Sequence, residues 1–139
     1  MGLVYAEVEL INSDDLALAR RNMIPDSDVR RLNATVNVDS GAIMLTINDQ
    51  VRAQLGLSKL GEQVAELADG SHIRVDIVGP VDVRFENRAT TVRAMLMPGD
   101  TEMLLGAIPM EDMDVIIHPR AQRLIVNPAS PTLAQKPLK

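Results

Sequence analysis

Short segments in which apolar and polar residues alternate are the feature that most constrains how this chain can fold. Every second side chain is apolar in residues 3–11, and the same period of two returns in residues 73–77, 81–86 and 91–96. Successive side chains of a β-strand point to opposite faces, so this period is that of a strand with one buried face. The sequence therefore predicts a protein built mainly from β-sheet.

Turn residues lie between these segments. Asp69-Gly70, Glu86-Asn87 and Pro98-Gly99 separate neighbouring stretches of the chain, and such pairs favour the tight turns that join antiparallel strands. Many short strands joined by regular turns indicate an all-β fold, either a sandwich or a barrel.

Helices are expected to be few and short. Ser13 can cap a first helix, and Asn48 can cap a second one that ends at Gly56. Pro109 suits the first turn of a last helix, because a helix needs no backbone N–H donor there.

Composition narrows the class of protein. The chain has 139 residues, of which 46% are hydrophobic and 24% charged, with a net charge of −5, as in a soluble globular protein. The absence of cysteine excludes disulfides and thiolate metal sites. One Tyr, one Phe and no Trp leave few aromatics to stack on nucleic-acid bases. No apolar run is long enough to span a membrane, and no secretory signal is recognisable, so we expect a cytoplasmic protein.

The domain boundaries follow from the end of the strand pattern. Residues 2–128 are predicted to form one domain without an internal repeat. The tail, residues 129–139, holds little apolar material and is expected to be disordered or loosely attached.

The stretch that carries most chemical information is Asp39-Ser40-Gly41-Ala42, which follows the apolar strand residues Val36 and Val38. Gly41 allows the backbone to fold closely beside the Asp39 carboxylate, and the Ser40 hydroxyl can form a hydrogen bond within the turn. Taken alone, an Asp-Ser-Gly sequence is also compatible with an ordinary β-turn.

Two later stretches give the motif its context. Leu104-Leu105-Gly106 places two apolar residues and a glycine ahead of the last expected helix, and residues 65–73 have the pattern of a hairpin. Together with Asp39-Ser40-Gly41, they resemble the retropepsin-like aspartic proteases (clan AA), and specifically a small single-lobe member of prokaryotic type. The resemblance covers residues 4–126. It implies a closed β-barrel with a flap hairpin and a few short helices.

The resemblance also implies roles for particular residues. It implies that the Leu104-Leu105-Gly106 strand passes behind the catalytic loop and supports it. The implied residues are catalytic Asp39, Ser40 and Gly41, substrate-binding Ala42, Ala68, Asp69, Gly70 and Ser71, and supporting Leu104, Leu105 and Gly106.

A homodimer follows from the number of motifs. The chain contains one Asp-Ser-Gly sequence, whereas the mechanism that the resemblance implies needs two facing aspartates. Two copies of the chain would supply Asp39 and its symmetry mate across a two-fold axis. Two close carboxylates share a proton, and the ionised one activates a water that attacks the peptide carbonyl. Neither a metal nor another cofactor is expected, and the expected partners are a second copy and a peptide or protein substrate.

Two stretches depart from the pattern of the family. The hairpin tip Asp69-Gly70-Ser71 contains one glycine and an extra charge, which leaves flap closure and substrate choice open. After Gly106 the chain reads Ala107-Ile108-Pro109 instead of the Arg-Asp or Arg-Asn of viral members. Their dimer-stabilising ion pair is therefore not carried over.

Other chemistry-bearing residues have simpler explanations. His72 and His118 lack companion ligands at metal spacing, and the acidic residues at 111–114 suit a helix start. The main alternative to a peptidase is a catalytically idle dimeric β-barrel that binds peptides or protein partners. An unrelated dimeric β-domain of regulatory type becomes the better interpretation if Asp39 lies far from the two-fold axis.

Overall fold

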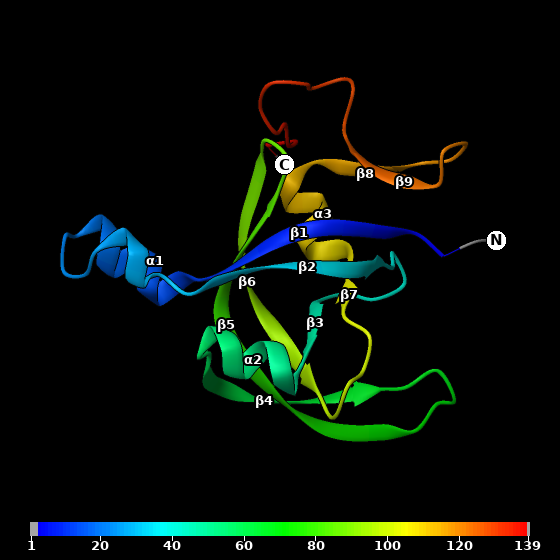
Figure 1. The fold of residues 1–139 in the computed structure, drawn as a ribbon. Coiled ribbons are helices and arrows are strands. Elements are labelled where there is room, and N and C mark those ends of the chain that lie inside the picture. The colour runs from blue at the N-terminus through cyan, green and yellow to red at the C-terminus, as the bar shows by residue number, and fades with distance from the viewer. Residues whose placement is uncertain (1–2, 139) are drawn as a thin grey trace.

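The segments with a period of two form the body of the protein, so the prediction of a mostly β-sheet fold is confirmed (Figure 1). A computed structural model describes residues 3–138. The strands are β1 (Tyr5–Asn12), β2 (Arg31–Val38), β3 (Leu45–Asn48), β4 (Ser58–Glu66), β5 (His72–Phe85), β6 (Arg88–Met97), β7 (Leu104–Leu105), β8 (Val115–His118) and β9 (Arg123–Val126). The helices are α1 (Ser13–Arg20), α2 (Asp49–Leu55) and α3 (Ala107–Met113), with a single 3-10 turn η1 (Asp26–Asp28).

Seven of the strands form one sheet, and six of these seven close into a ring. Their order is β1-β2-β7-β3-β6-β5-β4, and β1 also pairs with β5. Strand β4 therefore lies outside the ring and pairs with β5 as a long antiparallel hairpin. Strands β8 and β9 form a separate two-stranded sheet.

The ring encloses one hydrophobic core. Alternate residues of β1 point into it, as the sequence pattern predicts, and meet apolar side chains from β2, β3, β5 and β7. The burial of such aliphatic side chains is the main favourable contribution to stability. Fully buried members of this cluster are Leu10, Val36, Leu45, Ile47, Leu55, Val81, Val83 and Leu105.

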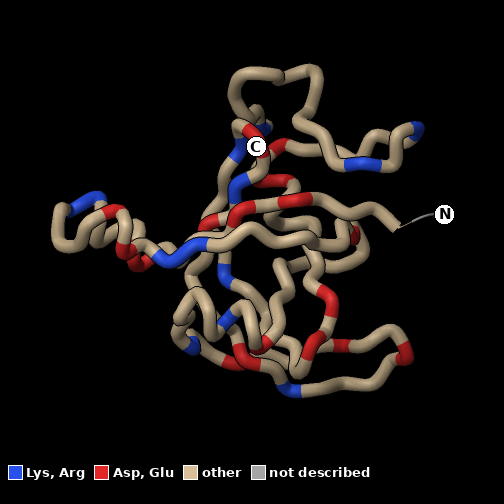
Figure 2. The backbone as a smooth tube through the Cα atoms, in the orientation of Figure 1, with Lys and Arg blue, Asp and Glu red and all other residues tan. Residues whose placement is uncertain are grey.

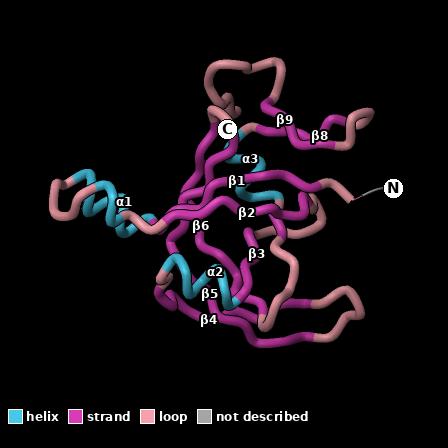
Figure 3. The backbone as a smooth tube through the Cα atoms, viewed as in Figure 1, coloured by secondary structure: helices cyan, strands magenta, loops and turns pink. Residues whose placement is uncertain are grey.

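Figure 3 shows α1 projecting away from the sheet, whereas α2 and α3 contribute side chains to the core. Asn48 caps α2 and accepts a hydrogen bond from the Val51 N–H, and Gly56 ends the helix in the left-handed conformation, as predicted. The cap of α1 differs from the prediction, because the Asn12 side chain accepts the Asp15 N–H and Ser13 is already helical. No helix within residues 3–138 has the length and apolar character needed to cross a membrane.

The segment after β9 packs against the rest of the fold. Ser130 is buried, its carbonyl accepts a hydrogen bond from Arg88 Nη2, and Asn87 Nδ2 donates to the Pro131 carbonyl at 2.9 Å. These contacts were not anticipated from the sequence, because they depend on polar groups and not on an apolar pattern.

Candidate active site

Asp39 lies where β2 ends, at the first position of a tight turn. The Gly41 N–H donates to Asp39 Oδ1 at 2.9 Å, and the Ala42 N–H donates to the Asp39 carbonyl at 3.1 Å. A Cβ at Gly41 would lie 3.2 Å from Asp39 Oδ1. The close approach of the Gly41 backbone to the carboxylate, predicted from the motif, is confirmed. The Asp39 side chain is half-buried and Ser40 is exposed beside it.

Strand β7 holds this turn from behind. It pairs in parallel with β2, and the Asp39 N–H donates to the Leu105 carbonyl at 3.0 Å. It also pairs with β3 through Thr46 and Leu104, so β7 joins the strands on both sides of the residue 39–44 loop. At Gly106 an added Cβ would lie 2.5 Å from the Met44 carbonyl oxygen, so a side chain does not fit there.

The first turn of α3 continues this support. The Ala107 N–H donates to the Ala42 carbonyl at 2.8 Å, and the Ile108 N–H donates to the Ile43 carbonyl at 2.9 Å. The 39–44 loop is thus attached to the fold through backbone hydrogen bonds at its start and its middle. Sequence reasoning missed Ala107 and Ile108, since a backbone donor has no side-chain signal.

The predicted hairpin of residues 65–73 is present as the end of β4 and β5. Ala65 pairs with Ile73 and Glu66 with His72. At the tip, the Gly70 N–H donates to the Leu67 carbonyl, and Gly70 adopts a φ of 85° that favours glycine. Asp69 Oδ1 accepts the Ser71 N–H at 2.9 Å, and hydrogen bonds from the Ser71 hydroxyl and N–H lower the pKa of Asp69.

A cleft of about 490 Å³ lies between the 39–44 loop and the β4–β5 hairpin. Its lining comes from residues 41–44, residues 63–67, the end of β6 and residues 101–104. Figure 1 shows this loop and the hairpin tip projecting toward the same side of the molecule. The structure therefore brings Gly41 of the Asp-Ser-Gly motif and the end of β4 to one cleft, whose lining does not include Asp39 or Ser40.

The predicted substrate-binding residues divide into two groups. Ala42 lines the cleft, whereas Ala68, Asp69, Gly70 and Ser71 form the hairpin tip beyond its lining. Sequence reasoning missed lining residues that look like ordinary strand or loop positions. These residues include Val64, Met95, Met97 and Glu102.

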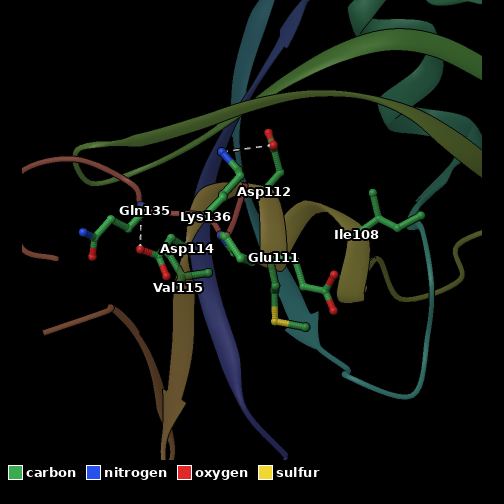
Figure 4. A pocket seen from close by; sticks show the side chains of 9 residues that line it. Ile108, Glu111, Asp112, Asp114, Val115, Gln135 and Lys136 are labelled. Carbon is green, nitrogen blue, oxygen red and sulfur yellow. Dashed lines mark hydrogen bonds and ion pairs between the residues drawn. The ribbon is translucent and has the colours of Figure 1, made fainter. Parts of the chain in front are cut away.

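A larger cavity, of about 630 Å³, lies at the opposite end of α3 (Figure 4). Two of the carboxylates that line it, Asp112 and Asp114, already have partners. Asp112 lies 3.3 Å from Lys136 Nζ, and Asp114 Oδ2 accepts the Gln135 N–H at 2.9 Å. We regard the smaller cleft as the candidate site, because Gly41 and Ala42 of the turn that holds Asp39 line it.

Within residues 3–138, no three His, Asp or Glu side chains come together in a way that could hold a metal ion. His72 Nε2 lies 3.3 Å from Glu66 Oε1, and His118 Nδ1 accepts the Ala121 N–H at 3.0 Å.

Comparisons with known proteins leave the family open. No protein-family model matches the chain, and no curated protein matches it. Among solved structures, the chain is similar to a protein of unknown function (DUF785) from Legionella pneumophila, with 12% sequence identity and a TM-score of 0.40. That match covers 82% of this chain and 91% of the other. A likeness at this level carries no argument about fold or function.

Proposed function

We propose that this protein is an aspartic endopeptidase of the retropepsin type, whose ring of strands is the closed β-barrel of that family. The observation that carries the proposal is the setting of Asp39. Its carboxylate is half-buried in a glycine turn, its backbone is fixed by Leu105, and the turn opens on a cleft below a hairpin. A carboxylate held in place but still accessible suits general acid–base chemistry.

A homodimer is part of this proposal, because each chain supplies one aspartate. Large apolar side chains are exposed around the 39–44 loop. The Val38 N–H donates to the Val4 carbonyl, which joins the residues before β1 to the end of β2. The Ile108 N–H donates to the Ile43 carbonyl, which joins α3 to the loop. Such a patch favours association with another surface. A two-fold contact there would bring Asp39 toward Asp39 of the partner subunit. The exposed residues are Leu3, Tyr5, Ile43 and Ile108.

The chemistry then follows from two neighbouring carboxylates. Mutual repulsion makes the pair retain one proton. The ionised carboxylate takes a proton from a water as its oxygen attacks the peptide carbonyl, and the protonated carboxyl donates a hydrogen bond to the carbonyl oxygen. Collapse of the tetrahedral intermediate breaks the C–N bond, and a proton passes to the departing amine. An extended peptide would lie in the cleft between the 39–44 loop and the β4–β5 hairpin.

Replacement of the aspartate tests this proposal. Asp39→Asn keeps the shape of the side chain but removes the base, so cleavage of a peptide library at acid pH should fall by about 100-fold or more. Asp28→Asn, an exposed aspartate in η1 away from the cleft, is the matched control and should cleave like the wild type. Equal cleavage by the Asp39→Asn variant would exclude the aspartic mechanism.

The alternative is an idle dimeric β-barrel that binds peptides or protein partners, and the cleft favours it as much as it favours a peptidase. The two functions differ in what happens to a bound peptide. If the wild type binds library peptides but leaves them intact at every pH tested, the binding function replaces the enzymatic one.

A further inference from the structure

The floor of the cleft is apolar and contains no aromatic side chain. Val64, Met95, Met97 and Leu104 contribute to it, with Ile43 at its edge. Methionine side chains are flexible and adapt to differently shaped apolar groups. This floor accepts an aliphatic side chain and discriminates weakly among apolar residues by shape, so any sharper selectivity must come from polar groups at the rim.

The rim carries negative charge. The lining of the cleft contains two acidic residues, Glu66 and Glu102, and no Lys or Arg. Figure 2 shows this acidic character on the β4–β5 hairpin tip and on the loop before β7. A cleft lined by one sign of charge favours ligands of the opposite charge. Three further acidic residues lie on the same stretches of chain but outside the lining: Asp39, Asp69 and Asp100.

Among these carboxylates, Glu102 is held in place by a neutral group. Its Oε2 accepts a hydrogen bond from Asn37 Nδ2 at 3.2 Å. The nearby Glu102 carboxylate raises the pKa of the Tyr5 hydroxyl. Asn37 orients the carboxylate without neutralising its charge. Glu66, in contrast, already faces His72 at 3.3 Å.

We propose that the cleft selects peptide segments in which a lysine or arginine flanks an aliphatic side chain, and that Glu102 binds the cationic group. This inference rests on the proposed function, because it takes the cleft as the substrate site. The aliphatic side chain fills the floor, and the neighbouring cation reaches the rim. The carboxylate is oriented before the substrate arrives, so binding does not incur the full entropy cost of ordering it.

Three matched fluorogenic peptides test the selection. They share one aliphatic residue and differ at the flanking position, which is Lys, Gln or Glu. At about pH 6, above the ordinary pKa of glutamate and below that of lysine, the wild type should cleave the Lys peptide with a kcat/KM about fivefold above that of the Gln peptide. The Glu peptide should be the poorest substrate, and added salt should reduce the differences.

Two variants assign the selection to one residue. Glu102→Gln keeps the size of the side chain but removes the charge, so the ratio of kcat/KM for the Lys peptide to kcat/KM for the Gln peptide should fall to about one. Glu111→Gln, an exposed glutamate on α3 outside the cleft lining, should keep the full preference. A preference for Lys that survives in Glu102→Gln overturns the assignment to Glu102.

Failure of the inference and failure of the proposed function give different results. If the wild type cleaves all three peptides equally, the peptidase stands and the charge selection is wrong. If it cleaves none, the proposed peptidase function is wrong. The proposed selection for a cationic residue is then tested by peptide binding, measured by fluorescence anisotropy. Binding of the Lys peptide that depends on Glu102 supports the selection, and equal binding of the three peptides overturns it.

Discussion

The two ends of α3 hold two aspartates in opposite ways. At the N-terminal end, the helix binds the 39–44 loop, and the Asp39 carboxylate accepts a hydrogen bond from Gly41. Just past the C-terminal end, Asp114 accepts hydrogen bonds from Asn127 Nδ2 at 2.9 Å, from the Ser130 hydroxyl and from the Gln135 N–H. One carboxylate is positioned through its backbone, whereas the other is surrounded by donors.

This difference separates a reactive carboxylate from a structural one. The donors around Asp114 favour its charged form and lower its pKa to about 2, with the Ser130 hydroxyl contributing most. A group locked in one charge state is a poor proton carrier near neutral pH. Within residues 3–138 Asp39 Oδ2 accepts no hydrogen bond, so this oxygen is available to act as a general base.

The contrast between the two ends of α3 is tested most strongly at Gly106, where β7 leads into α3. In Gly106→Ala the new methyl group would lie 2.5 Å from the Met44 carbonyl oxygen and 2.7 Å from the Ile43 carbonyl carbon. The 39–44 loop must shift to accommodate it, and we expect peptidase activity to fall by about 100-fold, as misplacement of a catalytic group by about 1 Å can do.

Gly61→Ala is the matched control for that variant. Gly61 lies on β4, has no heavy atom within 4 Å of an added Cβ, and does not adopt a positive φ. Its activity should equal that of the wild type. Full activity in Gly106→Ala would show that β7 and α3 do not position the loop.

Arg88 tests the structural end of α3. Its side chain is 1% exposed, Nη2 donates to the Ser130 carbonyl, and the same nitrogen lies 3.9 Å from Asp114 Oδ2. Arg88→Ala removes the positive charge beside Asp114 and leaves a void, so we expect the free energy of unfolding to fall by about 2 kcal/mol. The other donors to Asp114 remain, which keeps the loss below that of a fully broken buried ion pair.

Denaturant unfolding measures this effect. Arg93→Ala, an exposed arginine on the same strand β6, is the control and should change the stability by less than about 0.5 kcal/mol. Equal stability of the Arg88→Ala variant and the wild type would mean that residues 127–137 are not tied to the fold through Arg88.

These contacts also show what could be read from the sequence. The strands with alternating apolar residues, the Asn48 cap and the Asp69-Gly70 turn were predictable, because each depends on residues close together in the chain, whereas most of β4, a largely exposed strand, was not predicted. The Asp-Ser-Gly motif pointed to Asp39 by resemblance, and its catalytic role stays a prediction. Arg88 and Ser130 are 42 residues apart, and Asn37 and Glu102 are 65 apart. Residues so far apart in the chain leave no periodic pattern in the sequence. The C-terminal contacts and the rim of the cleft were therefore missed.

The smallest expected effect is an acid-induced release of residues 127–137. The pKa of Asp114 is lowered from its ordinary value of 3.8 to about 2 in the folded protein. A lowered pKa means that folding favours the charged form, so the contribution of Asp114 is fully present above about pH 4 and is lost as the pH falls through about 2. The pKa of Asp112 is lowered too, through Thr90 and Lys136, so global stability would mix both groups.

A local measurement avoids that mixture. Hydrogen exchange of the Ser130 and Gln135 amides should remain protected at about pH 4 and lose protection toward about pH 2. Asp114→Asn cannot be protonated in this range, so its amides should exchange faster at every pH and show no such transition. Asp28→Asn should behave as the wild type. If the wild-type amides were equally protected at about pH 4 and about pH 2, the Asp114 carboxylate would not be what attaches the segment. The contrast between the two ends of α3 would then lose its electrostatic basis, while the backbone support of Asp39 would be unaffected.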